Sequence, residues 1–139
     1  MSVEQNKAIM RRMTEEVFVK GNLSIIPDLV APNYVMHGQT DVKGPEGLKK
    51  MAETFRKAFP DYQETINYMV AEGDLVASFN TRQGTFMNDI GGMVATGKKS
   101  TGSVATLTRY ENGKQVEVWT YSDSLSWYRQ LGIPIPQGK

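Results

Sequence analysis

The sequence of 139 residues has no cysteine and a single histidine, His37. Without cysteine the chain can form no disulfide, no thiolate nucleophile and no cysteine-ligated zinc site. One histidine is also too few for a histidine-rich metal site. Cysteine-based catalysis and metal sites of these kinds are therefore excluded.

Neither sign of charge is in excess, since 16 lysine and arginine residues stand against 15 aspartate and glutamate residues. Basic residues come at most in pairs, such as Arg11-Arg12 and Lys98-Lys99. Nucleic-acid-binding proteins concentrate positive charge on one surface, so we expect no nucleic-acid partner. Charged residues also recur throughout positions 1–20, which neither a signal-peptide core nor a membrane span tolerates. We therefore expect a cytoplasmic protein with no membrane contact.

The composition is that of one globular domain. Apolar residues make up 40% and charged residues 22% of the chain, enough for a core and an ordinary surface. The length is close to the commonest domain size, and the chain shows no internal repeat, linker or low-complexity tract. We expect residues 1–139 to form a single domain.

Two segments have the apolar spacing of amphipathic helices. Apolar side chains recur at helical intervals over residues 4–20 and again over residues 44–59, where Pro60 follows as a stop signal. Between them, residues 24–30 indicate a short helical turn and residues 33–37 a short strand. The two long helices are both one-sided, so each needs a surface to pack against.

From Tyr62 onward the pattern changes to the period of two that is typical of strands. The alternation predicts that Ile66, Tyr68 and Val70 lie on one face. Asn112-Gly113 is the pair that favours a tight hairpin. The predicted strands are residues 62–71, 75–82, 100–110 and 115–123.

Helices followed by a run of hairpin-connected strands are typical of the α+β class. Hairpin-length connections require antiparallel pairing, because parallel strands need a long crossover. We therefore expect a curved antiparallel sheet that wraps around the N-terminal helices and leaves a cone with an open mouth.

Four stretches resemble the SnoaL-like polyketide cyclase and ester cyclase group of the NTF2-like (cystatin-like) superfamily. They cover nearly the whole chain and occur in the family's order. The stretches are NKAIMRRMTEEVFVKGNLSIIPDLVAPNYVMHG, GPEGLKKMAETFRKAFPD, VATGKKSTGSVATLTRYENGKQVEVW and DSLSWYRQLGIP. The resemblance implies a cone-shaped α+β barrel, a homodimer, no cofactor, and an acidic residue that serves as acid and base in an aldol ring closure.

Asp123 is the first catalytic candidate. Alternation along the last strand puts Glu117, Trp119, Tyr121 and Asp123 on one face, which we expect to line the cone. Desolvation there would raise the pKa of the Asp123 carboxyl toward values useful for a general base. Asp123 also matches the Asp of the family's DxLxxxxQLG motif. The alternative is that Asp123 caps the terminal helix beginning near residue 124.

His37 is the second catalytic candidate, and it matches the histidine of the family's YVxH strand, which points into the barrel. A neutral imidazole there could donate a hydrogen bond to a substrate carbonyl or orient Asp123. The alternative is an ordinary hydrogen-bonded core histidine. If His37 has the catalytic role, we expect its ring to be buried inside the cone.

Five further residues are candidates for substrate binding. Aromatic rings and methionines would shape an apolar pocket, although the same residues serve equally in a plain core. A guanidinium at the end of an otherwise uncharged strand could bind a carboxylate or ester oxygen, or could simply lie on the surface. The candidates are Trp119, Tyr121, Met36, Phe55 and Arg82.

The last strand departs from the family pattern at two positions. Many relatives resemble EHWDxxD there, whereas this chain reads EVWTYSD, so Val118 and Thr120 replace a histidine and an aspartate. The histidine of the frequent GTHxGxF motif is likewise Phe86 here. One carboxylate, one histidine and an aromatic pocket remain of the expected site.

These residues support three classes of function. The first is a cofactor-free enzyme that transfers protons on a small apolar carbonyl or ester substrate. The second is a noncatalytic protein that binds a small hydrophobic ligand, and the third is a dimeric protein-interaction scaffold. We expect a homodimer formed through the sheets, with Val116, Val118 and Thr120 on the outward face.

Overall fold

The fold was determined as a computed structural model, which describes residues 2–38 and 40–134. Its N-terminal part contains helices and two short strands, and its C-terminal part contains four long strands and a last helix. This order of helices and long strands was predicted from the sequence, whereas the two-residue strand β2 was not. The elements are α1 (Val3–Arg12), η1 (Met13–Val19), η2 (Leu23–Ile25), α2 (Ile26–Leu29), β1 (Val30–His37), β2 (Val42–Lys43), α3 (Gly44–Ala58), β3 (Gln63–Glu72), β4 (Leu75–Thr85), β5 (Lys99–Glu111), β6 (Lys114–Ser122) and α4 (Ser124–Leu131).

The first predicted helix is confirmed, but its second half is a π-helix. Ser2 caps it, because the Ser2 hydroxyl accepts from the Gln5 N–H while the Gln5 side chain accepts from the Ser2 N–H. In η1 the Lys20 N–H donates to the Glu15 carbonyl, five residues back, at 3.1 Å. The residues of η1 that are buried against the interior are Met13, Thr14 and Val17.

The six strands form one mixed sheet in the order β2-β1-β6-β5-β4-β3. All neighbours are antiparallel except β1 and β6, which are parallel. The expectation of a purely antiparallel sheet is therefore wrong. The expectation assumed that all neighbouring strands are joined by hairpins. More than half of the chain lies between β1 and β6, which is long enough for the crossover that parallel strands need.

The predicted hairpin between β5 and β6 is confirmed. Asn112 and Gly113 have φ angles of 51° and 77°, the left-handed conformation that a tight turn of this type requires. A second hairpin joins β3 to β4 at Gly73, whose φ is 60°. The predicted strand boundaries agree with the structure to within three residues for β3, β4, β5 and β6.

A β-bulge in β3 changes which side chains face inward. The register with β4 shifts between Ile66 and Tyr68, so that Asn67 is the extra residue. Ile66 is half-buried, whereas Tyr68 is 71% exposed and Val70 is 59% exposed. The prediction that these three share one face is therefore wrong, because a bulge breaks the strict period of two.

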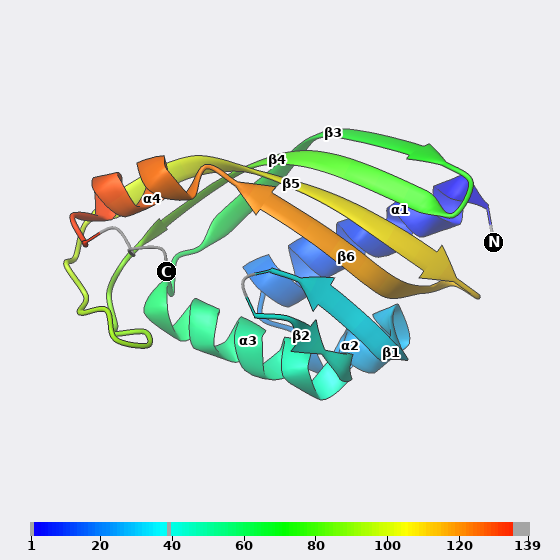
Figure 1. Cartoon of the computed structure of the whole chain (residues 1–139), viewed down its shortest axis with the longest axis horizontal. Coiled ribbons are helices and arrows are strands. Elements are labelled where there is room, and N and C mark those ends of the chain that lie inside the picture. The colour runs from blue at the N-terminus through cyan, green and yellow to red at the C-terminus, as the bar shows by residue number, and fades with distance from the viewer. Residues whose placement is uncertain (1, 39, 135–139) are drawn as a thin grey trace.

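The helices lie on the concave side of the curved sheet (Figure 1). Helix α1 packs against β3 and β4, while α3 packs against β1 and β2. The N-terminal core joins buried side chains of η1, α2, α3 and β1, among them Val17, Ile26, Leu29 and Leu48. We call the concave side of the sheet its inner face and the convex side its outer face.

A second core lies beneath α4. Trp127 and Leu131 of this helix pack on Phe59 and Phe86, where Phe59 follows α3 and Phe86 follows β4. This cluster closes one end of the space between α3 and the sheet. No helix among residues 2–38 and 40–134 is long and apolar enough to cross a membrane.

Candidate active site

A cavity of about 270 Å³ lies between the helices and the inner face of the sheet. We call it the inner pocket. Its helical wall is apolar and rich in methionine, and the π-helical segment contributes two members five residues apart, Met13 and Phe18. The apolar residues of this wall and of the adjoining β1 are Met10, Met13, Phe18, Met36, Met51 and Phe55.

The sheet supplies the opposite wall through side chains that are mostly small or β-branched. They come from alternate positions of β5 and of the later part of β6, as the pleat requires, while Gln115 lies before the shift of register between these two strands. The residues are Val104, Thr106, Thr108, Gln115, Val118 and Thr120. Val118 and Thr120 were expected on the outward face, and Val116, expected beside them, is only 8% exposed, so that prediction is wrong.

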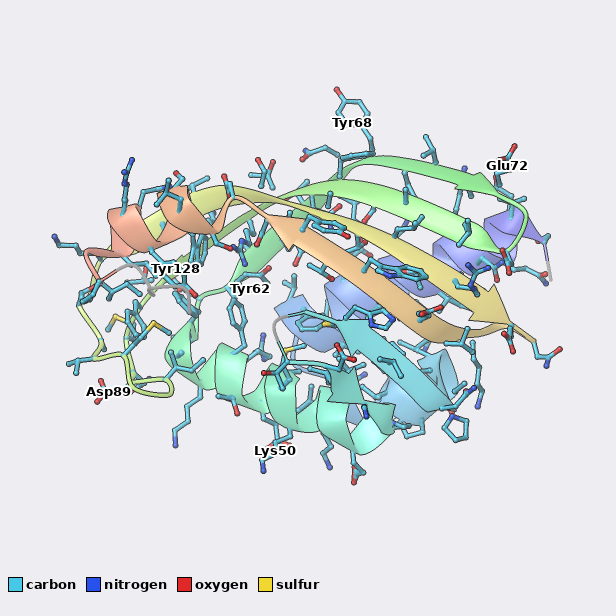
Figure 2. The ribbon with its side chains drawn as sticks, viewed as in Figure 1. Lys50, Tyr62, Tyr68, Glu72, Asp89 and Tyr128 are labelled. Carbon is cyan, nitrogen blue, oxygen red and sulfur yellow. The ribbon has the colours of Figure 1, made fainter. Side chains whose placement is uncertain are left out.

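The polar end of the inner pocket is formed by four residues of β3 and β4 and the turn before them. Tyr62 precedes β3 and points into the space between α3 and the sheet (Figure 2). Its hydroxyl donates to Glu64 Oε1 at 2.5 Å, and Asn80 Nδ2 donates to Glu64 Oε2 at 2.5 Å. Arg82 is the register partner of Glu64 on β4. The Glu64 carboxylate is therefore held by a donor on each oxygen.

Two polar atoms at this end have no hydrogen-bond partner among the described residues. They are Asn80 Oδ1 and Arg82 Nε, both fully shielded from solvent. The Arg82 guanidinium lies over the Trp127 ring, 4.1 Å from its centroid. Buried polar atoms are nearly always paired, so two unpaired atoms on neighbouring pocket-lining residues set this end of the pocket apart.

Tyr62 stays protonated over the working pH range. Its burial raises its pKa most, and the negative charge of Glu64 raises it further. A protonated phenol can donate its hydrogen to the carboxylate. Tyr62 therefore holds Glu64 in one orientation without itself exchanging protons.

Phe55 and Arg82 also line a second cavity of about 250 Å³, beneath α4. Its walls are largely aromatic and include Phe59, Trp127 and Tyr128. A ligand that contacts Arg82 therefore has apolar space on two sides.

Trp119 and Tyr121 do not lie in the inner pocket. Tyr121 is 71% exposed on the outer face, and Trp119 is half-buried there with its ring stacked on His37 at 5.4 Å. The expectation that they line the cone is therefore wrong. Alternation gives the period of a strand but not which of its two sets of side chains faces the core, and here the β-branched set does.

Asp123 is exposed at the end of β6 and does not line the inner pocket. Its Oδ1 accepts from the Ser103 N–H at 3.1 Å, on the neighbouring strand. It occupies the N-cap position of α4, but its side chain makes no capping hydrogen bond. The predicted placement of Asp123 inside the cone is wrong. The alternative, that Asp123 caps α4, is right about the position of the residue but wrong about its side chain.

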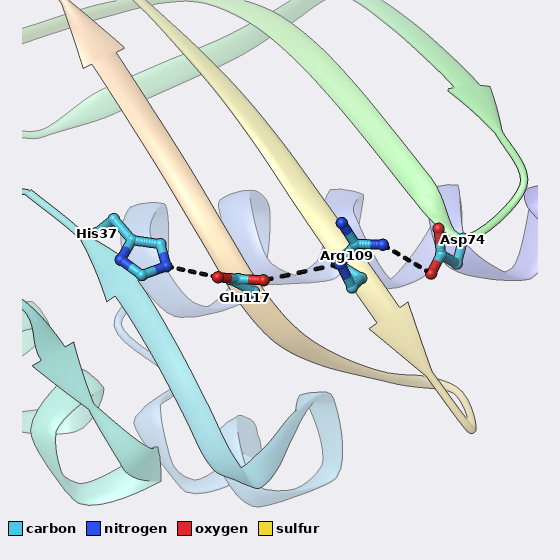
Figure 3. A network of polar contacts seen from close by, with 4 residues as sticks. All are labelled: His37, Asp74, Arg109 and Glu117. Carbon is cyan, nitrogen blue, oxygen red and sulfur yellow. Dashed lines mark hydrogen bonds and ion pairs between the residues drawn. The ribbon is translucent and has the colours of Figure 1, made fainter.

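His37 belongs to a network of polar contacts on the outer face (Figure 3). Its Nε2 lies 2.7 Å from Glu117 Oε2, and Glu117 Oε1 lies 3.7 Å from Arg109 Nε. Arg109 in turn donates to Asp74 at 3.0 Å. The His37 side chain is 35% exposed, so the prediction of a buried ring inside the cone is wrong.

Three of the predicted substrate-binding residues do line the inner pocket, namely Met36, Phe55 and Arg82. Sequence reasoning missed Glu64, Tyr62 and Asn80. The sequence did carry a signal of a polar site. Asn80 and Arg82 are polar residues two apart in a strand, and the residue between them is polar too, so polar side chains occur on both faces of the strand there. Among residues 2–38 and 40–134, no three histidine, aspartate or glutamate side chains form a group that could hold a metal ion.

Among the curated proteins to which the chain is similar are two cyclases from Streptomyces. Aklanonic acid methyl ester cyclase DauD from Streptomyces sp. (strain C5) is 28% identical over 134 residues, covering 92% of this chain and 82% of that protein. Aklanonic acid methyl ester cyclase DnrD from Streptomyces peucetius is also 28% identical over 134 residues, covering 92% of this chain and 91% of that protein.

Solved structures share the fold. Wild-type IdmH from Streptomyces antibioticus has a TM-score of 0.79 and 29% identity, covering 92% of this chain and 99% of that chain. TsrD from Streptomyces laurentii has a TM-score of 0.87 at 21% identity, covering 95% of this chain and 98% of that chain. These likenesses confirm the predicted NTF2-like α+β fold. A family model for SnoaL-like polyketide cyclases matches residues 8–131, and the chain therefore belongs to this family.

Proposed function

We propose that this protein is a cofactor-free enzyme that transfers a proton on a small apolar carbonyl or ester substrate bound in the inner pocket. The observation that carries the proposal is the pocket itself, in which apolar walls end in one cluster of polar groups. Such a site binds the body of a ligand by burial and orients it by a few polar contacts. The cytoplasmic location stays a prediction from the sequence.

An aldol ring closure is the reaction that fits best. A base removes a proton from a carbon next to a carbonyl, and the resulting enolate carbon forms a bond to a second carbonyl carbon of the same molecule. The oxygen of that carbonyl then takes up a proton, so the product is an isomer of the substrate. The reaction needs one proton acceptor, a donor for the developing negative charge and exclusion of water.

The two relatives named above support a polyketide ester as the substrate class, since both act on aklanonic acid methyl ester. The flexible methionine side chains of the helical wall suit an irregular apolar molecule. The second cavity extends the apolar space beyond Arg82.

A noncatalytic ligand-binding protein is the second candidate, and one observation favours it. Val118 and Thr120, which replace the histidine and the aspartate of the family pattern, both line the inner pocket. These two positions of β6 therefore place no ionisable group in the pocket. Under this proposal a ligand would bind without being changed.

The test is incubation of the protein with aklanonic acid methyl ester, followed by chromatography and mass spectrometry for a product of equal mass. A Thr120→Trp variant places an indole in the pocket, and we expect it to abolish both binding and turnover. Tyr121→Trp, one residue along on the outer face, is the matched control and should leave both unchanged. Binding without any product would favour the second candidate, whereas equal behaviour of the two variants would contradict both.

A further inference from the structure

We propose that Glu64 is the proton-transfer group of the inner pocket and that Arg82 receives the negative charge that develops on the substrate oxygen. This inference rests on the proposed function and adds the residues that would perform it. Neither residue lies on β6, so the chemistry is assigned to the opposite edge of the sheet, at β3 and β4.

Glu64 has the placement that a general base needs. Among the pocket-lining residues that the structure describes, it is the one carboxylic acid. Both of its oxygens accept hydrogen bonds, from Tyr62 and from Asn80, which hold the carboxylate in a single orientation. A fixed orientation favours proton transfer because the base need not reorganise when the substrate arrives.

Arg82 has a free donor in the same place. Among the described residues no ion pair joins Arg82 to Glu64, although the two are register partners on neighbouring strands. Its guanidinium instead lies over the Trp127 ring, 4.1 Å from the ring centroid. Arg82 lines the inner pocket, and its shielded Nε has no hydrogen-bond partner among the described residues, so the guanidinium has to turn within the pocket to donate to a substrate oxygen.

Asn80 completes the arrangement through its unused oxygen. It is 5% exposed, and its Nδ2 donates to Glu64 while its Oδ1 has no partner among the described residues. When Glu64 has taken up a proton, the same amide can turn and offer Oδ1 as the acceptor. The carboxyl group therefore keeps a hydrogen bond in both of its protonation states.

The step balances with these groups alone. The proton of the carbon next to the substrate carbonyl passes to Glu64, and the electron pair of that bond moves onto the carbonyl oxygen beside Arg82. The enolate carbon then bonds to a second carbonyl carbon, whose oxygen takes the proton back from Glu64. Tyr62 and Asn80 act as positioning residues and exchange no proton.

The test uses 5-nitrobenzisoxazole, a small aromatic probe whose five-membered ring opens when a base removes the proton from carbon 3. The proton passes to the base, the nitrogen–oxygen bond breaks, and a coloured cyanonitrophenolate forms. The probe needs no knowledge of the natural substrate. We expect wild-type protein to catalyse the opening, Glu64→Gln to lower the rate about tenfold or more, and Glu64→Asp to retain part of it.

The controls distinguish the loss of the base from the loss of the cation and from the loss of the folded structure. Asp123→Asn removes an acid outside the pocket and should leave the rate unchanged. Arg82→Gln should weaken binding of the cyanonitrophenolate product about tenfold, whereas Glu64→Gln should not weaken it, because Glu64→Gln removes a negative charge. Thermal melting shows whether each variant is folded, and Glu64→Gln should fold because Asn80 can turn its amide oxygen toward the new amide.

A wild-type rate no higher than that of Glu64→Gln overturns the inference. So does a rate that depends on Asp123 and not on Glu64. The proposed function fails separately, if the Glu64-dependent opening is present but no polyketide ester is turned over. Ester turnover that survives in folded Glu64→Gln removes this inference and leaves the proposed function standing.

Discussion

At the scale of single residues, Glu64 and Asp123 are carboxylates in different environments. Glu64 lines an apolar pocket and accepts from two side chains, whereas Asp123 is exposed and accepts from a backbone N–H. The chain resembles its family around Asp123, which is why sequence reasoning chose that residue. Family motifs identify conserved structure as readily as chemistry, so the geometry of the pocket has to decide between them.

We predict that Tyr62→Phe lowers kcat about tenfold and leaves KM nearly unchanged. The change keeps the ring but removes one hydrogen bond to the Glu64 carboxylate, and a bond to a charged group is worth about 1.5 kcal/mol. Steady-state kinetics on any substrate found separates the two constants. An equal loss in Tyr34→Phe, whose ring is buried in the same pocket and makes no hydrogen bond to Glu64, would indicate that packing alone is responsible.

At the scale of elements, the pocket depends on how α3 is joined to the sheet. Asp61 follows α3 and accepts from both the N–H and the hydroxyl of Thr85 at the end of β4, each at 2.7 Å. These two hydrogen bonds, the hydroxyl first, lower the pKa of Asp61. They connect the helical wall to the strand that carries Asn80 and Arg82.

We predict that Asp61→Asn lowers the free energy of unfolding at pH 7 by no more than about 1 kcal/mol, because solvent screens this exposed group. The pKa is lowered in the folded state, so the stabilisation is present above the unfolded pKa of about 3.9 and is lost as the pH falls through the folded value. Urea unfolding from pH 7 to pH 3 should show the difference between the two proteins shrinking.

The control for this prediction is Glu53→Gln, on the exposed side of α3. It removes the same charge but no hydrogen bond to the described residues, so its effect should be smaller at pH 7. A difference for Asp61→Asn that grows toward acid pH would contradict the assigned role.

At the scale of the whole molecule, the outer face of the sheet carries apolar side chains from four adjacent strands. Tyr68 points away from the molecule on this face (Figure 2). Contiguous exposed apolar side chains are typical of a contact surface. The exposed residues are Tyr68, 71%; Val70, 59%; Phe79, 50%; Leu107, 36%; and Tyr121, 71%.

We predict a homodimer formed through this face. Of the residues first expected there, Val118 and Thr120 line the inner pocket and Val116 is buried, so the prediction now rests on the exposed aromatic residues. Sedimentation at micromolar concentration should give a dimer for wild type and a monomer for the double variant Tyr68→Lys/Tyr121→Lys, with ligand binding in the inner pocket retained.

The dimer prediction has two contrary outcomes. A wild-type monomer would leave the outer face free for a different protein, which is the scaffold function considered from the sequence. A dimer that persists in the double variant would place the contact elsewhere on the molecule.

The sequence by itself determined the elements and the family. The period of 3.6 over residues 44–59 and the period of two after Tyr62 come from local backbone geometry, and Asn112-Gly113 requires a tight hairpin wherever it occurs. Four motifs in order over the chain were also enough to predict the NTF2-like fold.

Only the tertiary structure decided which face of each strand is inside. On β6 both faces carry apolar residues, so hydrophobicity could not choose between Trp119 and Val118. The bulge at Asn67 then reversed the phase within β3. The meeting of Glu64 with Asn80 depends on the register between two strands, and the parallel pairing of β1 with β6 joins distant parts of the chain. Register and long-range pairing are set by the packing of the whole core, which no local pattern contains.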